Sequence, residues 1–389
     1  MTPNNPTLLL LPLLLMLLLA LASCKPEEGV PEAYSISLDD IEFDFNRLVK
    51  RATIYPLETT THSLMQGIDR VYRTEDEFII YDTMARQALI FDTLGTHRLT
   101  IQNIGDGPGE YRYLTDVLYD PQGERLGFAR SETGELLWYD KQGRYLHADH
   151  MSISSFYLSR AIIHNERIYH YSANPKANPD HDQVHVTSLD LSEIYQSHFR
   201  TNTEELSGRN FQTFTVLDGE VYFFLPYSTE LHRIEEGEAS DVFRFDFMEW
   251  TAPEDLLREF LDEKNFNRRI ELNQRMSPYV SVRNVYPLND RRVLIPFTHM
   301  RQPHVAVVSL DTGEASVHHP RLVATNISNV VATIPDENIF YYSISPTSVA
   351  WWLSQGEDVS GIGNIERAKQ ILAENDPEQL NPWIIRVEF

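Results

Sequence analysis

Cysteine and positive charge are both scarce in this chain. Cys24 is the one cysteine among 389 residues, which excludes an internal disulfide, a thiolate zinc site and any cysteine nucleophile beyond Cys24 itself. Lys and Arg number 33 against 57 Asp and Glu, so the formal charge is −24. A chain this acidic repels polyanions, and we expect no nucleic-acid partner. The metalloprotease, serine-hydrolase and paired-cysteine motifs are missing too, so we expect no cofactor.

The longest apolar run, residues 8–21, ends just before Cys24. This pattern resembles a bacterial lipoprotein signal, which is cleaved before a cysteine that carries lipid. We predict a signal peptide at 1–23, lipidation of Cys24 and a tether at 24–33, with the lipid bilayer of the outer membrane as the partner of that lipid. No Lys or Arg precedes the run, so an uncleaved membrane anchor or a mis-assigned start is the alternative.

Residues 34–389 form one repeating domain. Each unit has an apolar strand, a polar turn and a second strand rich in aromatic and β-branched residues, at the spacing of roughly 40 to 50 residues typical of propeller blades. We therefore predict an all-β, six-bladed β-propeller; a two-layer sandwich is the alternative. The six strand pairs are 68–72 with 78–81, 117–119 with 125–128, 161–163 with 167–171, 214–217 with 221–225, 282–286 with 293–297, and 330–334 with 339–344.

The two terminal strands indicate how the ring closes, and two helical segments indicate where the repeats carry insertions. The last strand, 383–389, leaves the sixth blade one strand short, and 52–57 has no blade of its own, so we expect the two to pair and close the ring. Two helical insertions interrupt the repeats, at 251–274 and at 346–382, the second with a helix at 365–372. In the first, Thr251 and Glu254 fit a capping box.

The first third of the chain resembles a known family. Residues 56–59, 67–69, 78–82 and 90–92, and above all the Gly-x-Gly-Pro-Gly-Glu-Tyr element at 105–111, are similar to the six-bladed β-propeller lipoproteins of Bacteroidetes-type bacteria. The resemblance implies a fold related to NHL and TolB-type propellers and a place in the cell envelope, and it implies no established reaction. The residues after Cys24 also resemble the export signal of surface lipoproteins in these bacteria, although a plain solvated linker is equally consistent.

The glycine-rich element has two interpretations. Its glycines suggest a phosphate cradle, but their spacing is not that of a nucleotide-binding loop, and proline removes one of the amides that a cradle needs. We favour a turn linking the first and second blades. The residues concerned are Gly105, Gly107, Pro108, Gly109, Glu110 and Tyr111.

Histidines in the third unit are the best candidates for metal ligands, although we favour a solvated loop. His181 and His185 would lie roughly 13 Å apart in an extended strand, too far to share one ion without a turn. The candidates are His164, His170, His181 and His185, with Asp180 and Asp182.

The insertions are the best pointers to function. Both leave the ring through loops that emerge on one face, so we expect them to surround the mouth of the central channel, where elaborated loops commonly bind ligands. Arginine and tryptophan suit a carboxylated or sulfated sugar; the favoured alternative is salt bridges between helices and buried indoles. The candidate ligand-binding residues are Arg268, Arg269, Arg275, Trp351 and Trp352.

We thus predict an envelope-anchored protein that binds a ligand, such as a glycan, or an envelope protein on this face. One rival is a lactonase or lyase of the NHL-like type, with a metal held at the channel mouth by residues such as Asp69 and Asp116. The other rival is a structural scaffold of an outer-membrane complex.

Overall fold

The structure is a computed structural model, and it describes residues 33–39, 41–42, 48–130, 133–151, 160–171, 182–200, 214–224, 228–234, 242–263, 265–282, 284–319, 330–334 and 337–389. The chain divides into two units, 1–32 and 33–389, and all described residues belong to the second. The predicted signal peptide, Cys24 and all but the last residue of the tether lie outside them. No helix among the described residues is long and apolar enough to span a membrane.

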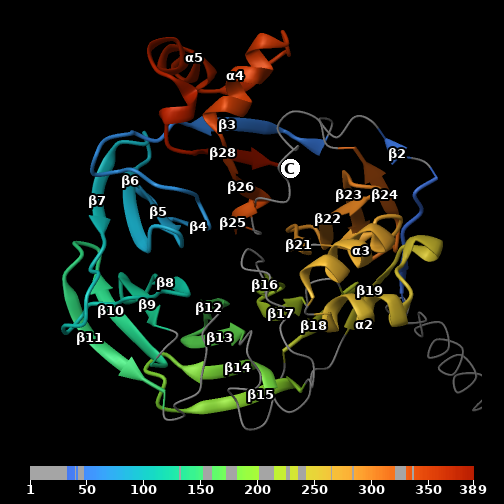
Figure 1. The fold of residues 1–389 in the computed structure, drawn as a ribbon, viewed down its shortest axis with the longest axis horizontal. Coiled ribbons are helices and arrows are strands. Elements are labelled where there is room, and N and C mark those ends of the chain that lie inside the picture. Colours follow the sequence, from blue (N-terminus) through green and yellow to red (C-terminus); the bar gives the residue numbers. More distant parts are fainter. Residues whose placement is uncertain are drawn as a thin grey trace, which may run out of the picture. The chain divides into compact units, whose positions relative to one another are not determined.

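Six antiparallel sheets form the blades of a ring, so the predicted six-bladed β-propeller is confirmed (Figure 1). Each of the six predicted strand pairs lies in its own blade. The first three blades have four strands each, written from the inner strand outward. They are β4 (Arg70–Arg73), β5 (Glu77–Asp82), β6 (Gln87–Asp92) and β7 (His97–Ile101); β8 (Asp116–Asp120), β9 (Arg125–Arg130), β10 (Glu135–Asp140) and β11 (Tyr145–His150); and β12 (Arg160–His164), β13 (Arg167–Tyr171), β14 (Asp182–Ser188) and β15 (Ile194–Arg200).

Blades four and five each carry one extra strand from the N-terminal region. Pairing in parallel, β1 (Tyr34–Ser35) joins the outer strand of blade four and β2 (Ile41–Glu42) joins that of blade five. The blade strands are β16 (Phe214–Leu217), β17 (Glu220–Phe224), β18 (Glu230–Arg233) and β19 (Val242–Asp246), then β20 (Ser281–Val282), β21 (Tyr286–Pro287), β22 (Arg292–His299), β23 (Gln302–Ser309) and β24 (Ala315–His318).

Blade six closes the ring with strands from both ends of the propeller. Its strands are β25 (Val330–Ile334), β26 (Ile339–Ile344), β28 (Trp383–Glu388), β3 (Arg51–Tyr55) and β27 (Ile362–Gly363). The C-terminal β28 pairs antiparallel with the N-terminal β3, with Ile385 opposite Ile54. The predicted closure is thereby confirmed, with the N-terminal strand at 51–55.

The core lies between neighbouring blades because side chains alternate between the two faces of each sheet. In β5, for example, Ile79 and Tyr81 pack with blade two, whereas Phe78 and Ile80 pack on the other side, with blade six. Apolar clusters of this kind fill every junction of the ring. The period-2 pattern of the sequence therefore specifies both the strands and their packing.

Among the described residues, helices are confined to the two insertions, apart from isolated turns. The first contains a 3-10 turn, η3 (Met248–Trp250), and helices α2 (Glu254–Asp262) and α3 (Phe266–Met276); the second contains α4 (Pro346–Ser354), α5 (Ile365–Glu374) and the 3-10 turn η7 (Pro377–Gln379). The predicted capping box is wrong, because α2 begins after Pro253 and no side chain caps it. Pro253 is the N-cap residue, so α2 begins at Glu254, two residues later than a helix capped by Thr251 would begin.

Candidate functional site

The two insertions leave the ring on the same face, which we call the insertion face. The first joins the outer strand β19 to the inner strand β20, and the second joins β26 to β28, the second and third strands of blade six. In an antiparallel blade these two kinds of connection lie at the same end of the strands. The channel-mouth expectation is nonetheless wrong for the second insertion, because β27 pairs with β3 as the outermost strand of blade six, and α4 and α5 lie at the rim (Figure 1).

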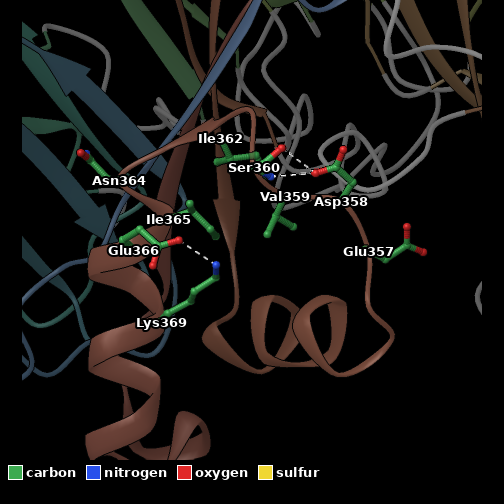
Figure 2. A pocket seen from close by; sticks show the side chains of 9 residues that line it. All are labelled: Glu357, Asp358, Val359, Ser360, Ile362, Asn364, Ile365, Glu366 and Lys369. Atoms are coloured by element: carbon green, nitrogen blue, oxygen red, sulfur yellow. Dashed lines mark hydrogen bonds and ion pairs between the residues drawn. The ribbon is translucent and has the colours of Figure 1, made fainter.

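The second insertion contains a pocket of about 530 Å³ (Figure 2). Val359, Ile362 and Ile365 are buried beneath it, while the carboxylates of Glu357, Asp358 and Glu366 lie at exposed positions. The complete lining is Glu357, Asp358, Val359, Ser360, Ile362, Asn364, Ile365, Glu366 and Lys369.

Two carboxylates of the pocket are held in place by neighbours. Asp358 accepts hydrogen bonds from the Ser360 hydroxyl at 2.7 Å and the Ser360 amide at 3.0 Å, and these bonds lower the pKa of that carboxyl. Lys369 Nζ lies 2.7 Å from Glu366 Oε1. The pocket therefore presents more negative than positive charge, on an apolar floor.

Trp351 and Trp352 lie on α4 and point in different directions, as successive residues of a helix must. Ser345 caps this helix by accepting a hydrogen bond from the Ser348 amide, and Pro346 occupies its first turn. The side chain of Trp352 is 2% exposed within the core of blade six, whereas that of Trp351 is 57% exposed. Of the two indoles, only that of Trp351 is accessible from solvent, and it is not among the residues that line the pocket.

The three arginines lie on α3, in the first insertion. Arg268 donates to Glu259 at 2.7 Å and to Glu271 at 2.7 Å, and Arg275 donates to Glu259 at 2.9 Å. These hydrogen bonds, that of Arg268 first, lower the pKa of Glu259. Arg269 lies over the Phe260 ring, 5.4 Å from its centre.

The predicted ligand-binding residues therefore divide between two places. Arg268, Arg269 and Arg275 belong to the first insertion, over blades four and five, whereas Trp351 and Trp352 belong to the second, beyond β3 (Figure 1). The structure does not bring the arginines and the tryptophans together.

The glycine-rich element forms the turn between β7 and β8, the outer strand of blade one and the inner strand of blade two. Glu110 accepts from the Gly107 amide at 2.8 Å, and the buried Tyr111 donates from its hydroxyl to Arg86 O at 3.0 Å. Gly109 has φ of 75° and lies against the Tyr145 ring, which leaves no space for a Cβ. The Gly107 amide thus donates its hydrogen bond to Glu110 within the turn, which is the arrangement of a structural turn.

A cluster of opposite charges lies on the inner strands of blades one to three. Arg70, Asp116 and Arg160 are the first residues of β4, β8 and β12, so they lie at the channel side of the insertion face. Asp116 is fully buried and accepts from Arg70 at 2.9 Å, from the Ala161 amide at 2.9 Å and from Arg160 at 3.5 Å. Burial works to lower the pKa of Arg70, but Asp116, Tyr72 and Tyr81 together outweigh it and the pKa is raised.

This cluster links three blades and leaves Asp116 no open position for a metal. Asp69, the other carboxylate considered for such a site, accepts from the Thr83 amide at 2.7 Å. Within the described ranges, no group of three His, Cys, Asp or Glu side chains is placed to hold a metal ion.

Of the third-unit histidines that the structure describes, two lie together and His164 contacts another residue. His170 and His185 lie on strands β13 and β14 rather than in a loop, and their buried rings stack at 5.2 Å. His164 lies 2.9 Å from Gly219 O. Asp180 and His181 lie outside the described residues.

Comparison with known proteins identifies the family. The model of a family described as "Domain of unknown function (DUF4934)" matches residues 32–388. The chain belongs to the DUF4934 family. No curated protein matches this DUF4934 chain significantly.

Solved structures similar to this DUF4934 protein share its fold. A protein from Bacteroides fragilis NCTC 9343 described as exported is 14% identical, with a TM-score of 0.70 over 92% of this chain and 99% of that chain. A member of the DUF4221 family from Bacteroides vulgatus ATCC 8482 is 11% identical, with a TM-score of 0.50 over 88% of this chain and 96% of that chain. The propeller fold that the family resemblance implied is therefore confirmed.

The insertion face of this DUF4934 chain thus carries three polar groups of different character. The inner-strand cluster around Asp116 is buried and internally paired, and Arg268 and Arg275 are paired with Glu259. The residues that line the pocket of the second insertion, by contrast, face an open volume (Figure 2). Sequence reasoning found the insertion but missed this pocket, because its lining has no recognisable motif.

Proposed function

We propose that this protein is a lipid-anchored binding protein of the cell envelope, and that its ligand occupies the pocket of the second insertion. The observation that carries the proposal is this pocket of about 530 Å³ in an elaborated connection of a rigid ring. Ligand sites commonly lie in such loops, and 300–1,000 Å³ is a usual range for a pocket that takes a small molecule.

An uncharged sugar fits the chemistry of the lining. The carboxylates of Glu357, Asp358 and Glu366 accept hydrogen bonds from sugar hydroxyls, and such charge-assisted bonds are the stronger kind. Trp351 lies on the helix that leads directly to Glu357, and its exposed indole offers a stacking surface. A carboxylated or sulfated sugar, by contrast, would meet three carboxylates against the one ammonium group of Lys369.

The binding test uses the Cys24→Ala chain on an array of neutral and acidic oligosaccharides, followed by titration calorimetry. We expect binding to neutral oligosaccharides, weakened about tenfold or more by Trp351→Ala and about tenfold by Glu357→Gln. Matched controls are Phe266→Ala, an exposed aromatic of the first insertion, and Glu314→Gln, an exposed carboxylate of blade five. Equal losses in variants and controls, or binding to acidic sugars alone, would place the site elsewhere.

The anchoring part of the proposal has a separate test. Cys24→Ala should release a folded, soluble chain from the membrane fraction, because acyl chains contribute about 0.8 kcal/mol per buried CH₂ and one residue carries them all. Metabolic labelling with a fatty acid should mark the natural chain and leave the variant unlabelled. A variant that remains in the membrane fraction would contradict the lipoprotein interpretation.

A further inference from the structure

Four histidines gather at one end of blade five, in a segment without a recognisable metal or catalytic motif. His299 ends β22, His304 lies in β23, His318 ends β24 and His319 follows it. The rings of His304 and His319 lie 5.5 Å apart, and those of His299 and His304 lie 6.3 Å apart. His299, His304 and His318 are each at least nine-tenths buried.

Two segments from outside the ring are fastened at this end of blade five. One is the N-terminal strap, defined as residues 33–39 and 41–42: Glu42 pairs with His318, and the His319 amide donates to Glu42 O at 2.9 Å. The other is the first insertion, which reaches blade five through Trp250, 4.7 Å from the His299 ring, and through Ser277 O, 3.0 Å from the Met300 amide.

These surroundings suit neutral imidazoles and not imidazolium ions. His304 stacks on Phe297 at 5.3 Å, and neither His304 Nδ1 nor His299 Nε2 has a hydrogen-bond partner among the described residues. In the strap, the Glu42 carboxylate has its Oε2 3.6 Å from His318 Nδ1, whereas the Asp39 carboxylate contacts Ser37. The first insertion presents the indole of Trp250 and backbone groups of residues 277 and 278.

We propose that this histidine cluster is an acid-sensitive latch, which holds the strap and the first insertion on blade five at neutral pH and releases them on acidification. Protonation would place positive charges on adjacent buried rings, with Glu42 as the one carboxylate paired with them among the described residues. Release of the strap and the first insertion would expose these rings to water, which solvates the charges. The rest of the ring, closed by β3 and β28, would stay folded.

The direction of the pH effect follows from the pKa values. Burial, together with His319 and His299, lowers the pKa of His304 to about 4, and burial also lowers the pKa values of His299 and His318. Because the open state binds protons more tightly than the closed state, closure is strongest above about pH 6.5 and weakens as pH falls toward 4. His304 alone should raise the opening equilibrium roughly 30-fold at pH 5 relative to pH 7.5.

Hydrogen exchange of the full chain at pH 7.5 and pH 5, corrected for the intrinsic pH dependence of exchange, tests the latch. We expect peptides from β1, β2, α2 and α3 to lose about 30-fold of their protection at pH 5, while β5 and β6 of blade one keep theirs. His304→Gln and His304→Phe should each remove the roughly 30-fold share of this acceleration that His304 contributes. His150→Gln, a change at an exposed histidine of blade two, should leave it intact.

Two results would overturn the latch. One is full acid acceleration in both His304 variants; the other is blade one losing protection in step with the strap, which would indicate global unfolding. If the strap and the first insertion of the His304→Gln chain already exchange rapidly at pH 7.5, the result for the His304→Phe chain decides the test. That substitution keeps an aromatic ring at the position that stacks on Phe297. Full acceleration in a His304→Phe chain that is closed at pH 7.5 would then refute the proposal.

Discussion

The two helical insertions leave the same face of the ring but are held in opposite ways. The first packs α2 against α3 around a small cluster of Phe260, Leu272 and Met276, and ion pairs also join these two helices. Its links to the ring include the Trp250–His299 ring contact and backbone hydrogen bonds. The second contributes to the main core of the ring. There α4, β27, α5 and the connection between α4 and β27 bury six side chains: Val349, Trp352, Val359, Ile362, Ile365 and Ala368.

The two insertions therefore have equivalent positions in the topology but different structural roles. The first insertion is an appendage fastened to the ring at its edges. The second is part of ring closure, because Ile362 pairs with Ala52 and the Asn364 side chain donates to Ile54 O at 3.0 Å. A pocket built on the second insertion is therefore held rigid by the closing blade, which favours it as a preorganised ligand site.

We expect the largest difference in stability between two deletions, one in the closing blade and one in the first insertion. Removing 383–389 takes away β28, and with it the partner of β3 and the buried side chains of Trp383, Ile385, Val387 and Phe389. Burial of each is worth about 1.5 to 3 kcal/mol, so the loss approaches the whole stability of a domain. We expect no cooperative unfolding transition in calorimetry.

Replacing 254–276 by a short glycine-serine linker is the matched deletion in the first insertion. It should leave a cooperative transition and a native-like circular dichroism spectrum for the ring. If both deletions unfold the protein, or neither does, the distinction between appendage and closing element is wrong.

Adjacent tryptophans of α4 give a sharper version of the same contrast. Trp352→Ala should destabilise the protein by about 3 to 5 kcal/mol, because it empties a core position that is 2% exposed. Trp351→Ala removes a side chain that is 57% exposed and should change stability by less than about 0.5 kcal/mol. Urea unfolding of both variants measures the difference. Similar effects would mean that α4 is not docked as described.

The sequence was sufficient for the blades because each depends on a local pattern repeated six times. Alternation in residues such as 78–81 specifies a strand and both of its packing faces, and closure follows from one unpaired strand at each end of the ring. The same reasoning failed at Thr251, where a match to the capping pattern was overridden by Pro253.

The candidate site was less predictable because it depends on contacts between distant segments. Nothing in Ile362 and Gly363 marks a two-residue strand that docks on β3, yet that pairing carries the second insertion to the rim. Asp116 was considered as a metal ligand because its arginine partners lie 46 and 44 residues away in sequence. A signal for the histidine cluster did exist, since the fifth unit holds four histidines within 21 positions, from His299 to His319.

The smallest effect is expected from the arginines of α3. Arg268 and Arg275 are ion-paired with Glu259 at the surface, and surface pairs of this kind contribute little. The triple change of Arg268, Arg269 and Arg275 to Ala should therefore lower the melting temperature by no more than about 2 °C. Since these arginines lower the pKa of Glu259, their small contribution exists above about pH 4.5, disappears in acid and shrinks with salt. Neutral-sugar binding should be unchanged, whereas a large loss of binding in the triple variant would return the ligand site to the first insertion.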